Sequence, residues 1–243
     1  ILICTSLSAN AIKGPFGVLE PAKLEVDRPL FDLYYTDLQD KTLDGDVSAY
    51  MEGGLRYYYG FSRRLDMQTP KDYKAASRWF YEAAMKGNDK AAYYLGTMYL
   101  RGQGVPAEYK TAIWWLSKAS KQGLNQATYM LGNVYYQMSS DKRFPESYRE
   151  FYFEQAKINY KLLDGIAYPR ALFNLAYISL KHNDVTRFIK ADANGYLMRA
   201  LPGFIAENDR ANAYETLKLM KFNKLSDYKK AEELFNANFK SSF

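Results

Sequence analysis

The chain has 243 residues, of which 48% are hydrophobic and 16% aromatic, so it can bury a sizeable core and is not wholly disordered. The net charge of +6 comes from dispersed Lys and Arg residues, which disfavours a nucleic-acid-binding protein because no dense basic stripe is present. With one cysteine, Cys4, and one histidine, His182, the chain has no internal disulfide, no Cys/His zinc cluster and no favoured Ser–His–Asp or Cys–His catalytic set.

Residues 1–11 form a short apolar run, "ILICTSLSANA", that ends in small residues. Ala9 and Ala11 are spaced as at the cleavage site of a secretory signal peptide, which predicts a truncated signal peptide and an exported, soluble, periplasmic or secreted protein. An ordinary buried strand or linker is the alternative. No stretch reaches the roughly 18 apolar residues of a membrane-spanning helix.

Residues 12–45 form a separate N-terminal segment that can supply a capping helix. Its acidic run, "DLQDKTLDGD", carries Asp37, Asp40, Asp44 and Asp46. These spacings do not match the ligand positions of an EF-hand loop, so the run predicts a helix end followed by an Asp-Gly turn. We expect no bound metal and no cofactor.

An internal repeat organises the next part of the chain, because a shift of 36 residues superposes identical residues in fixed register. The superposed pairs are Tyr73/Tyr109, Ala76/Ala112, Trp79/Trp115, Ala83/Ala119, Gly87/Gly123, Ala91/Ala127, Leu95/Leu131, Gly96/Gly132 and Tyr99/Tyr135. Looser copies precede and follow this pair. We therefore predict repeats over residues 46–180, then a degenerate helical repeat with C-terminal capping helices over 181–243.

Each repeat unit is predicted to be two helices joined by a tight turn. Apolar spacing predicts a helix over 91–101 and a second over 107–122, separated by a Gly-Pro turn at 102–106. One helix pair cannot bury both of its faces, so the units are expected to stack into an all-α, right-handed solenoid of antiparallel helix pairs. The glycines of "RGQGVP" are not a phosphate loop, because neither a preceding strand nor a following Gly-Lys-Ser/Thr is present.

The segment "AAYYLGTMYLRGQGVPAEYKTAIWWLSKASKQG", residues 91–123, resembles a Sel-one-like repeat, a relative of the tetratricopeptide repeat. The resemblance assigns structural roles to the positions that match its pattern. These are Gly96, Tyr99, Gly102, Gly104, Ala112, Trp115 and Gly123, with Gly132 in the next unit. It departs at Thr111, where the pattern has lysine, and at Ser120, where it has alanine.

The resemblance also implies that the first helix of each unit lines a concave groove, with the second, sixth, ninth and tenth positions after the repeat alanine facing it. The predicted groove residues are Met51, Leu55, Tyr58, Tyr59, Tyr93, Thr97, Leu100, Arg101, Tyr129, Asn133, Tyr136, Phe173 and Tyr177. A groove rich in Tyr, Met and Arg is typical of protein-binding surfaces. The alternative for each residue is packing inside the superhelix.

The function predicted from these features is a non-catalytic adaptor that binds a segment of a partner protein in the groove. The first alternative is a peptidoglycan or carbohydrate binder, whose groove tyrosines stack on sugar rings. A cell-wall hydrolase is the second alternative, but nothing in the sequence singles out a catalytic carboxylate pair among the 27 Asp and Glu residues.

Overall fold

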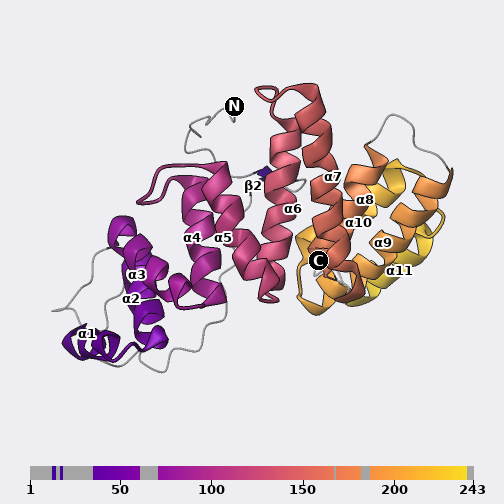
Figure 1. The fold of residues 1–243 in the computed structure, drawn as a ribbon. Helices are drawn as coiled ribbons and strands as arrows, with labels where there is room; N and C mark the ends of the chain where they lie inside the picture. Colours follow the sequence, from indigo (N-terminus) through magenta and orange to yellow (C-terminus); the bar gives the residue numbers. More distant parts are fainter. Residues whose placement is uncertain are drawn as a thin grey trace. The chain divides into compact units, whose positions relative to one another are not determined.

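The computed structural model describes residues 13–14, 17–18, 35–60, 71–166, 168–181 and 187–239. This described part is helical apart from one antiparallel ladder with two residues in each strand (Figure 1). The chain forms two compact units, residues 1–137 and 138–243. Neighbouring helices pack against each other within each unit, so the predicted all-α fold of stacked helix pairs is confirmed. The expected signal segment, Cys4 and His182 lie outside the described residues.

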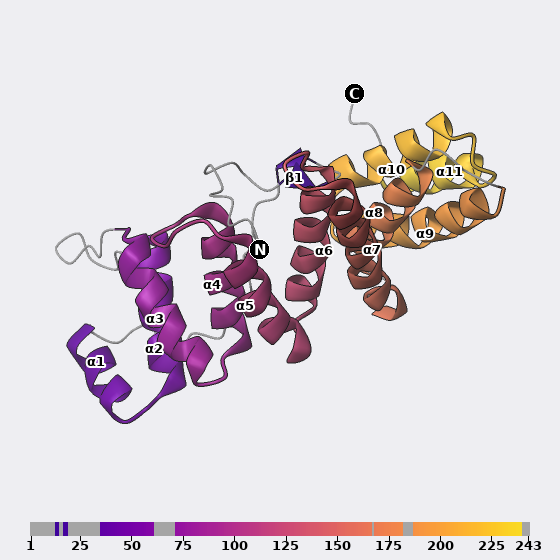
Figure 2. The ribbon, with the colours of Figure 1, turned by 45° about the horizontal axis from the view of Figure 1, so that its top comes forward.

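The first unit contains the ladder and the helices up to α6, whose last residues belong to the second unit. Its elements are β1 (Lys13–Gly14), β2 (Gly17–Val18), α1 (Tyr35–Leu43), α2 (Val47–Tyr59), α3 (Tyr73–Met85), α4 (Asp89–Arg101), α5 (Tyr109–Lys121) and α6 (Asn125–Ser140). Helices α2 to α5 follow one another in space as they do in sequence, each packed on the next (Figures 1 and 2).

The turn that joins α4 to α5 depends on glycine. Gly102 and Gly104 have φ angles of 66° and 70°, in the left-handed region that side chains with a Cβ rarely adopt. A Cβ built on Gly104 would lie 2.3 Å from the carbonyl carbon and oxygen of Tyr73, the first residue of α3. The turn of one helix pair therefore touches the backbone of the pair before it.

Aromatic rings fill the space between the two helix pairs. The ring of Phe80 on α3 stacks on that of Tyr94 on α4, with centroids 4.9 Å apart and planes 8° apart. Tyr58 on α2 contacts both rings, at 6.0 Å from Phe80 and 5.4 Å from Tyr94. Gly54 leaves room for this packing, because a Cβ there would lie 2.4 Å from the Phe80 ring. We call Tyr58, Phe80 and Tyr94 the aromatic cluster.

Side chains of α5 also bond to the C-terminal end of α3. Lys118 donates from Nζ to the carbonyl oxygen of Ala84 at 2.7 Å, and Gln122 donates from Nε2 to the carbonyl oxygen of Gly87 at 2.7 Å. The Ala84 carbonyl oxygen also accepts a bond from the Gly87 amide at 3.1 Å, so the Lys118 bond adds a second donor to this carbonyl. Two consecutive helix pairs are thereby joined by polar as well as apolar contacts.

Helix α2 carries a buried ion pair. Arg56 donates from Nε to Oε1 of Glu52 at 2.7 Å, and both side chains are almost wholly buried. In α4 the equivalent positions, 42 residues later, hold Tyr94 and Met98, which are also buried. At the same repeat positions, α2 thus buries a charged pair and α4 buries an aromatic and an apolar side chain.

The second unit consists of helices that follow α6. They are α7 (Glu146–Leu162), the 3₁₀ helix η1 (Asp164–Ile166), α8 (Pro169–Leu180), α9 (Arg187–Ala206), α10 (Arg210–Phe222) and α11 (Tyr228–Asn238). Helix α8 packs on α7 and α9, and α9 packs on α10 and α11. Two hydrogen bonds hold the start of α11 on α9, one from Asn194 Nδ2 to Asp227 Oδ2 at 2.7 Å and one from the Asp227 amide back to Asn194 Oδ1 at 3.3 Å.

Candidate functional site

Most of the predicted groove residues are buried. The buried ones are Met51, Leu55, Tyr58, Tyr93, Thr97, Leu100, Tyr129, Asn133 and Phe173. Arg101, Tyr136 and Tyr177 are half-buried, and Tyr59 is 44% exposed. Since α4 packs on both α3 and α5, its side chains at these positions are covered rather than presented to solvent. A role for these residues in partner binding stays a prediction.

Some of the buried residues already have a structural role. The hydroxyl of Thr97 donates to the carbonyl oxygen of Tyr94 at 2.7 Å, within its own helix. Tyr58 belongs to the aromatic cluster, and its hydroxyl donates to Gln103 Oε1 at 3.3 Å. The Tyr59 hydroxyl lies 3.0 Å from that of Tyr94. In the second unit, the rings of Phe173 and Tyr177 stack with centroids 6.3 Å apart.

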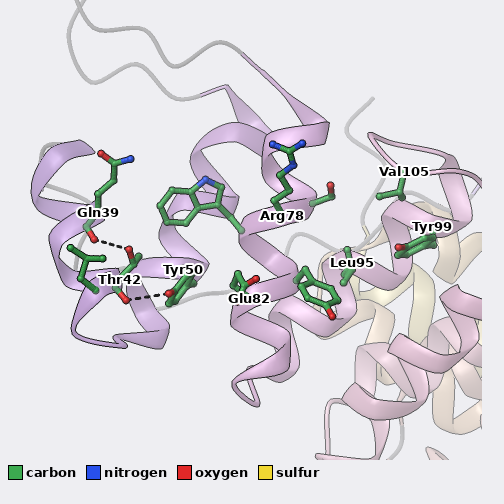
Figure 3. A pocket seen from close by; sticks show the side chains of 12 residues that line it. Gln39, Thr42, Tyr50, Arg78, Glu82, Leu95, Tyr99 and Val105 are labelled. Carbon is green, nitrogen blue, oxygen red and sulfur yellow. Dashed lines mark hydrogen bonds between the residues drawn. The ribbon is translucent and has the colours of Figure 1, made fainter.

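A cavity of about 640 Å³ lies elsewhere in the first unit, with α3 along its length and α1 at one end (Figure 3). Its lining residues are Gln39, Thr42, Leu43, Tyr50, Ser77, Arg78, Trp79, Tyr81, Glu82, Leu95, Tyr99 and Val105. None of them is a predicted groove residue. Ligand sites in proteins typically have volumes of about 300–1,000 Å³, so the cavity is large enough for a side chain or a small molecule.

The periodicity of α3 explains which of its side chains reach the cavity. Ala76, Phe80 and Ala83 face the core and are wholly buried. Arg78 and Glu82, one helical turn apart, lie on the opposite side and are exposed. The same amphipathic pattern that packs α3 therefore places a cation and an anion along one wall of the cavity.

Trp79 lines the cavity and lies against α2. A Cβ built on Gly53 would lie 2.3 Å from the Trp79 ring, so the absence of a side chain at Gly53 lets the indole lie against the α2 backbone. The indole ring also faces Tyr50, with centroids 6.1 Å apart. Glycine in α2 is thus a determinant of the cavity shape.

At the α1 end of the cavity one hydrogen bond joins α2 to α1 and another lies within α1 (Figure 3). Tyr50 of α2 donates its hydroxyl to the carbonyl oxygen of Thr42 at 3.1 Å, and the Thr42 hydroxyl donates to the carbonyl oxygen of Gln39 at 2.6 Å. Asp46 begins α2 by accepting a bond from the Ser48 amide at 2.8 Å, so this acidic residue of the predicted turn caps a helix.

The cavity combines aromatic and charged side chains. Tyr50, Trp79, Tyr81 and Tyr99 supply ring surface. Among the residues that the structure describes, the side chains of Arg78 and Glu82 make no hydrogen bond or ion pair. Rings can bind apolar groups or sugar faces, a guanidinium can donate to carbonyl or carboxylate oxygens, and a carboxylate can accept from amides or hydroxyls. Side chains of these kinds line many ligand sites.

No group of three or more His, Cys, Asp or Glu side chains that could hold a metal ion occurs within the described ranges. No helix in the described part of the chain is both long enough and apolar enough to cross a membrane.

Sequence reasoning missed the cavity because its walls come from both inside and outside the repeat. Gln39 and Thr42 precede the repeats and lie on α1, which packs on α2 and accepts a bond from Tyr50 at the Thr42 carbonyl oxygen. One feature of α3 indicates the cavity. Tyr81 lies three residues after Arg78, on the polar face of the helix, and is 45% exposed. A large aromatic side chain on a solvent-facing stripe is a feature that sequence analysis can detect.

Comparison with known proteins identifies the repeat. The family model for the Sel1 repeat matches residues 47–88 and residues 89–124. These segments correspond to the helix pairs α2–α3 and α4–α5. Comparison with curated proteins gives no match.

Two solved structures are similar to the chain. A Sel1 repeat protein from Oxalobacter formigenes is 27% identical, with 54% of this chain and 95% of that chain covered and a TM-score of 0.41. A protective antigen present in uropathogenic Escherichia coli strains, described as displaying an SLR fold, is 18% identical, with 86% of this chain and 60% of that chain covered and a TM-score of 0.31. The family match and the helix pairs together show that residues 47–124 are two consecutive Sel1 repeats.

Proposed function

We propose that this chain is a non-catalytic adaptor that binds a segment of a partner protein through its first unit. Sel1 repeats are in general protein–protein interaction modules and non-catalytic scaffolds. The observation that carries the proposal is the cavity along α3, where exposed charged groups and aromatic rings lie together beside two such repeats.

The chemistry of the cavity favours an extended segment with one or two apolar side chains. Trp79 and Tyr81 offer ring surface to those side chains. Arg78 and Glu82 stand one turn apart, so they can bond to a backbone carbonyl and a backbone amide of the same segment. A preformed site of this kind limits the ordering cost to that of the segment.

The test is a peptide library selected for binding to the full chain, followed by affinity measurement on the selected peptides. We expect the double substitution Arg78→Ala and Tyr81→Ala to raise the dissociation constant about tenfold or more, as for residues at the centre of an interface. Trp114→Ala is the matched control, since Trp114 is 55% exposed on α5 and does not line the cavity. Selected peptides that bind the double variant as well as the native chain would exclude the cavity.

The predicted groove provides a second location for the same partner. Tyr59 is exposed and Arg101 is half-buried, so these two side chains have surface that a partner can reach. If the groove binds the segment, Tyr59→Ala with Arg101→Ala will weaken binding of the selected peptides and the α3 double variant will not. The two pairs of variants therefore separate the two locations.

A carbohydrate ligand is the second candidate function. The observation that favours it is the combination of several neighbouring rings with Gln39, Arg78 and Glu82, because sugars bind by stacking on rings and by bonding to amide and carboxylate groups. Co-sedimentation with purified peptidoglycan and titration with soluble saccharides, monitored by tryptophan fluorescence, would test it. Turnover of a cell-wall substrate would instead support the hydrolase, provided that replacing an Asp or Glu residue abolishes the turnover.

Export of the protein is part of the proposal and rests on residues 1–11, which lie outside the described residues. A fusion of the natural N-terminus to a reporter that is active only outside the cytoplasm tests it. An inactive fusion that accumulates in the cytoplasm would contradict export.

A further inference from the structure

Helix α7 of the second unit has an apolar face on each of two sides. One face lies in the core of the unit and contains Tyr152, Ala156, Asn159 and Tyr160, all buried. A second row of apolar side chains points to solvent. These side chains are Tyr148, Phe151, Ile158 and Leu162, which are 55%, 54%, 50% and 68% exposed.

The exposed row has the spacing of a helix–helix contact. Tyr148, Phe151, Gln155, Ile158 and Leu162 follow one another at intervals of three, four, three and four residues. This is the a/d spacing of a heptad repeat, in which every side chain of the row faces the same neighbouring helix. We call these five residues the α7 seam. Chance exposure of apolar side chains would not produce this order over four helical turns.

The seam forms one contiguous apolar stripe. Four large apolar side chains, each about half exposed, add up to a patch on the order of 400 Å², which is the size of the largest apolar patch on a typical monomeric protein, and such patches are often functional. The periodicity indicates that the occupant is another α-helix, because only a helix repeats its contacts every three and four residues.

The order of residues along the seam fits an antiparallel pair, in which a residue at heptad position a lies opposite one at position d of the other helix. Tyr148, Gln155 and Leu162 are at position a, and Phe151 and Ile158 are at position d. A two-fold axis midway between Gln155 and Ile158 places Phe151 opposite Leu162 of the second copy and Gln155 opposite Ile158 of the second copy.

The charged residues beside the seam are arranged by sign along α7. Glu150 and Glu154 lie along one edge in the first half of α7, and Lys157 and Lys161 lie along the same edge in the second half. Within one chain Lys157 bonds to Glu154 at 2.9 Å. In an antiparallel two-fold pair this edge of one helix lies beside the same edge of the other with its direction reversed, so the acidic half of one helix lies beside the basic half of the second.

We propose that the α7 seam binds the α7 seam of a second copy of this chain, antiparallel and around a two-fold axis midway between Gln155 and Ile158. A two-fold interface requires a self-complementary surface, and the seam is self-complementary in the spacing of its apolar residues and in the charges beside it. This inference does not depend on the proposed function of the first unit.

The area of the seam sets the strength of the association. Stable complexes bury about 800 Å² on each partner, and one exposed helix face supplies less than that. We therefore expect a dimer that forms and dissociates rapidly, with a dissociation constant on the order of micromolar to tens of micromolar. Sedimentation velocity of the full chain over a wide concentration range should show a mass that doubles as concentration rises.

Substitutions in the seam test its role directly. Phe151→Glu should leave the chain monomeric at every concentration, because it places a charge in the apolar contact on both copies. Phe222→Glu is the matched control, since Phe222 is 85% exposed on α10 of the same unit and lies outside the seam. Circular dichroism melting of both variants checks that folding is unchanged. A native chain that stays monomeric at high concentration would overturn the proposal.

Charge reversal tests the antiparallel arrangement. One variant, Glu150→Lys with Glu154→Lys, makes the edge wholly basic, and the other, Lys157→Glu with Lys161→Glu, makes it wholly acidic. Each variant alone should dimerise at least about tenfold more weakly than the native chain, while an equal mixture of the two should form a heterodimer. Equal dimerisation of all three proteins would show that some other surface holds the copies together.

Discussion

Helices α2 and α4 begin the two Sel1 repeats, and they bury different groups at the same two repeat positions. In α4, Tyr94 stacks on Phe80 of the preceding repeat and Met98 is wholly buried. In α2 the same positions hold Glu52 and Arg56, which form an ion pair. Helix α2 is preceded by α1 and not by a matched repeat, so its outer face meets different neighbours. The two repeats thus share their backbone and their glycines, while the type of side chain that each buries depends on the neighbouring helices.

Removing a ring from the contact between the repeats should have the largest effect. Phe80→Ala should lower the free energy of unfolding of the first unit by about 4 kcal/mol, because it removes a wholly buried ring that packs on Tyr94 and Tyr58. All three tryptophans, Trp79, Trp114 and Trp115, lie in this unit, so urea unfolding followed by tryptophan fluorescence reports on it alone.

Phe222→Ala is the control for this measurement, because Phe222 is mostly exposed and belongs to the second unit. It should leave the tryptophan-detected transition unchanged. A change of less than about 1 kcal/mol for Phe80→Ala would mean that the aromatic cluster does not hold the repeats together.

Breaking the ion pair of α2 should have the second largest effect. Glu52→Ala should cost about 3 kcal/mol, since it removes the carboxylate that accepts the 2.7 Å bond from buried Arg56. Replacing both residues with the kind of side chain that α4 uses, Glu52→Leu with Arg56→Met, should recover stability to within about 1 kcal/mol of the native chain.

The same tryptophan-detected unfolding measures both α2 variants. If the double variant is as unstable as Glu52→Ala, the residues around the ion pair do not accommodate the apolar side chains that α4 buries at these positions. Recovery would mean that the two helices differ in neighbours and not in fold.

The smallest effect is expected at the polar link between the repeats. Lys118→Met should cost about 1 kcal/mol, because it removes the 2.7 Å bond to the Ala84 carbonyl while keeping the length of the side chain. Lys121→Met, on the exposed side of the same helix, should have no measurable effect. Equal stability of the two variants would show that water replaces the Lys118 bond without cost.

The repeat and its turn could be predicted from the sequence because they depend on local spacing. The helix predicted over 91–101 begins at Asp89 and ends at Arg101, and the one predicted over 107–122 runs from Tyr109 to Lys121. The second helix starts later because Glu108 takes the N-cap position. The turn could be predicted because glycine occupies its positions of positive φ, and this can be recognised without knowing which distant residues contact it.

The candidate sites could not be predicted in the same way, because they depend on contacts between distant residues. Thr97 and Leu100 have the spacing of groove residues, but the neighbouring helices of the stack cover them. The cavity depends on α1, which precedes the repeats and packs on α2. The seam on α7 is visible in the sequence as spacing alone. Only the structure separates it from the buried face of the same helix.

The close approach of Gly104 to Tyr73 has a consequence for how the protein can vary. Two backbones in direct contact act as a spacer of fixed thickness, which no rotamer change or core substitution can compress or extend. Residues in the aromatic cluster can therefore change the stability of the stack while the distance between successive helix pairs stays constant. Any binding surface laid across the two repeats keeps its dimensions, so its specificity can be altered one side chain at a time.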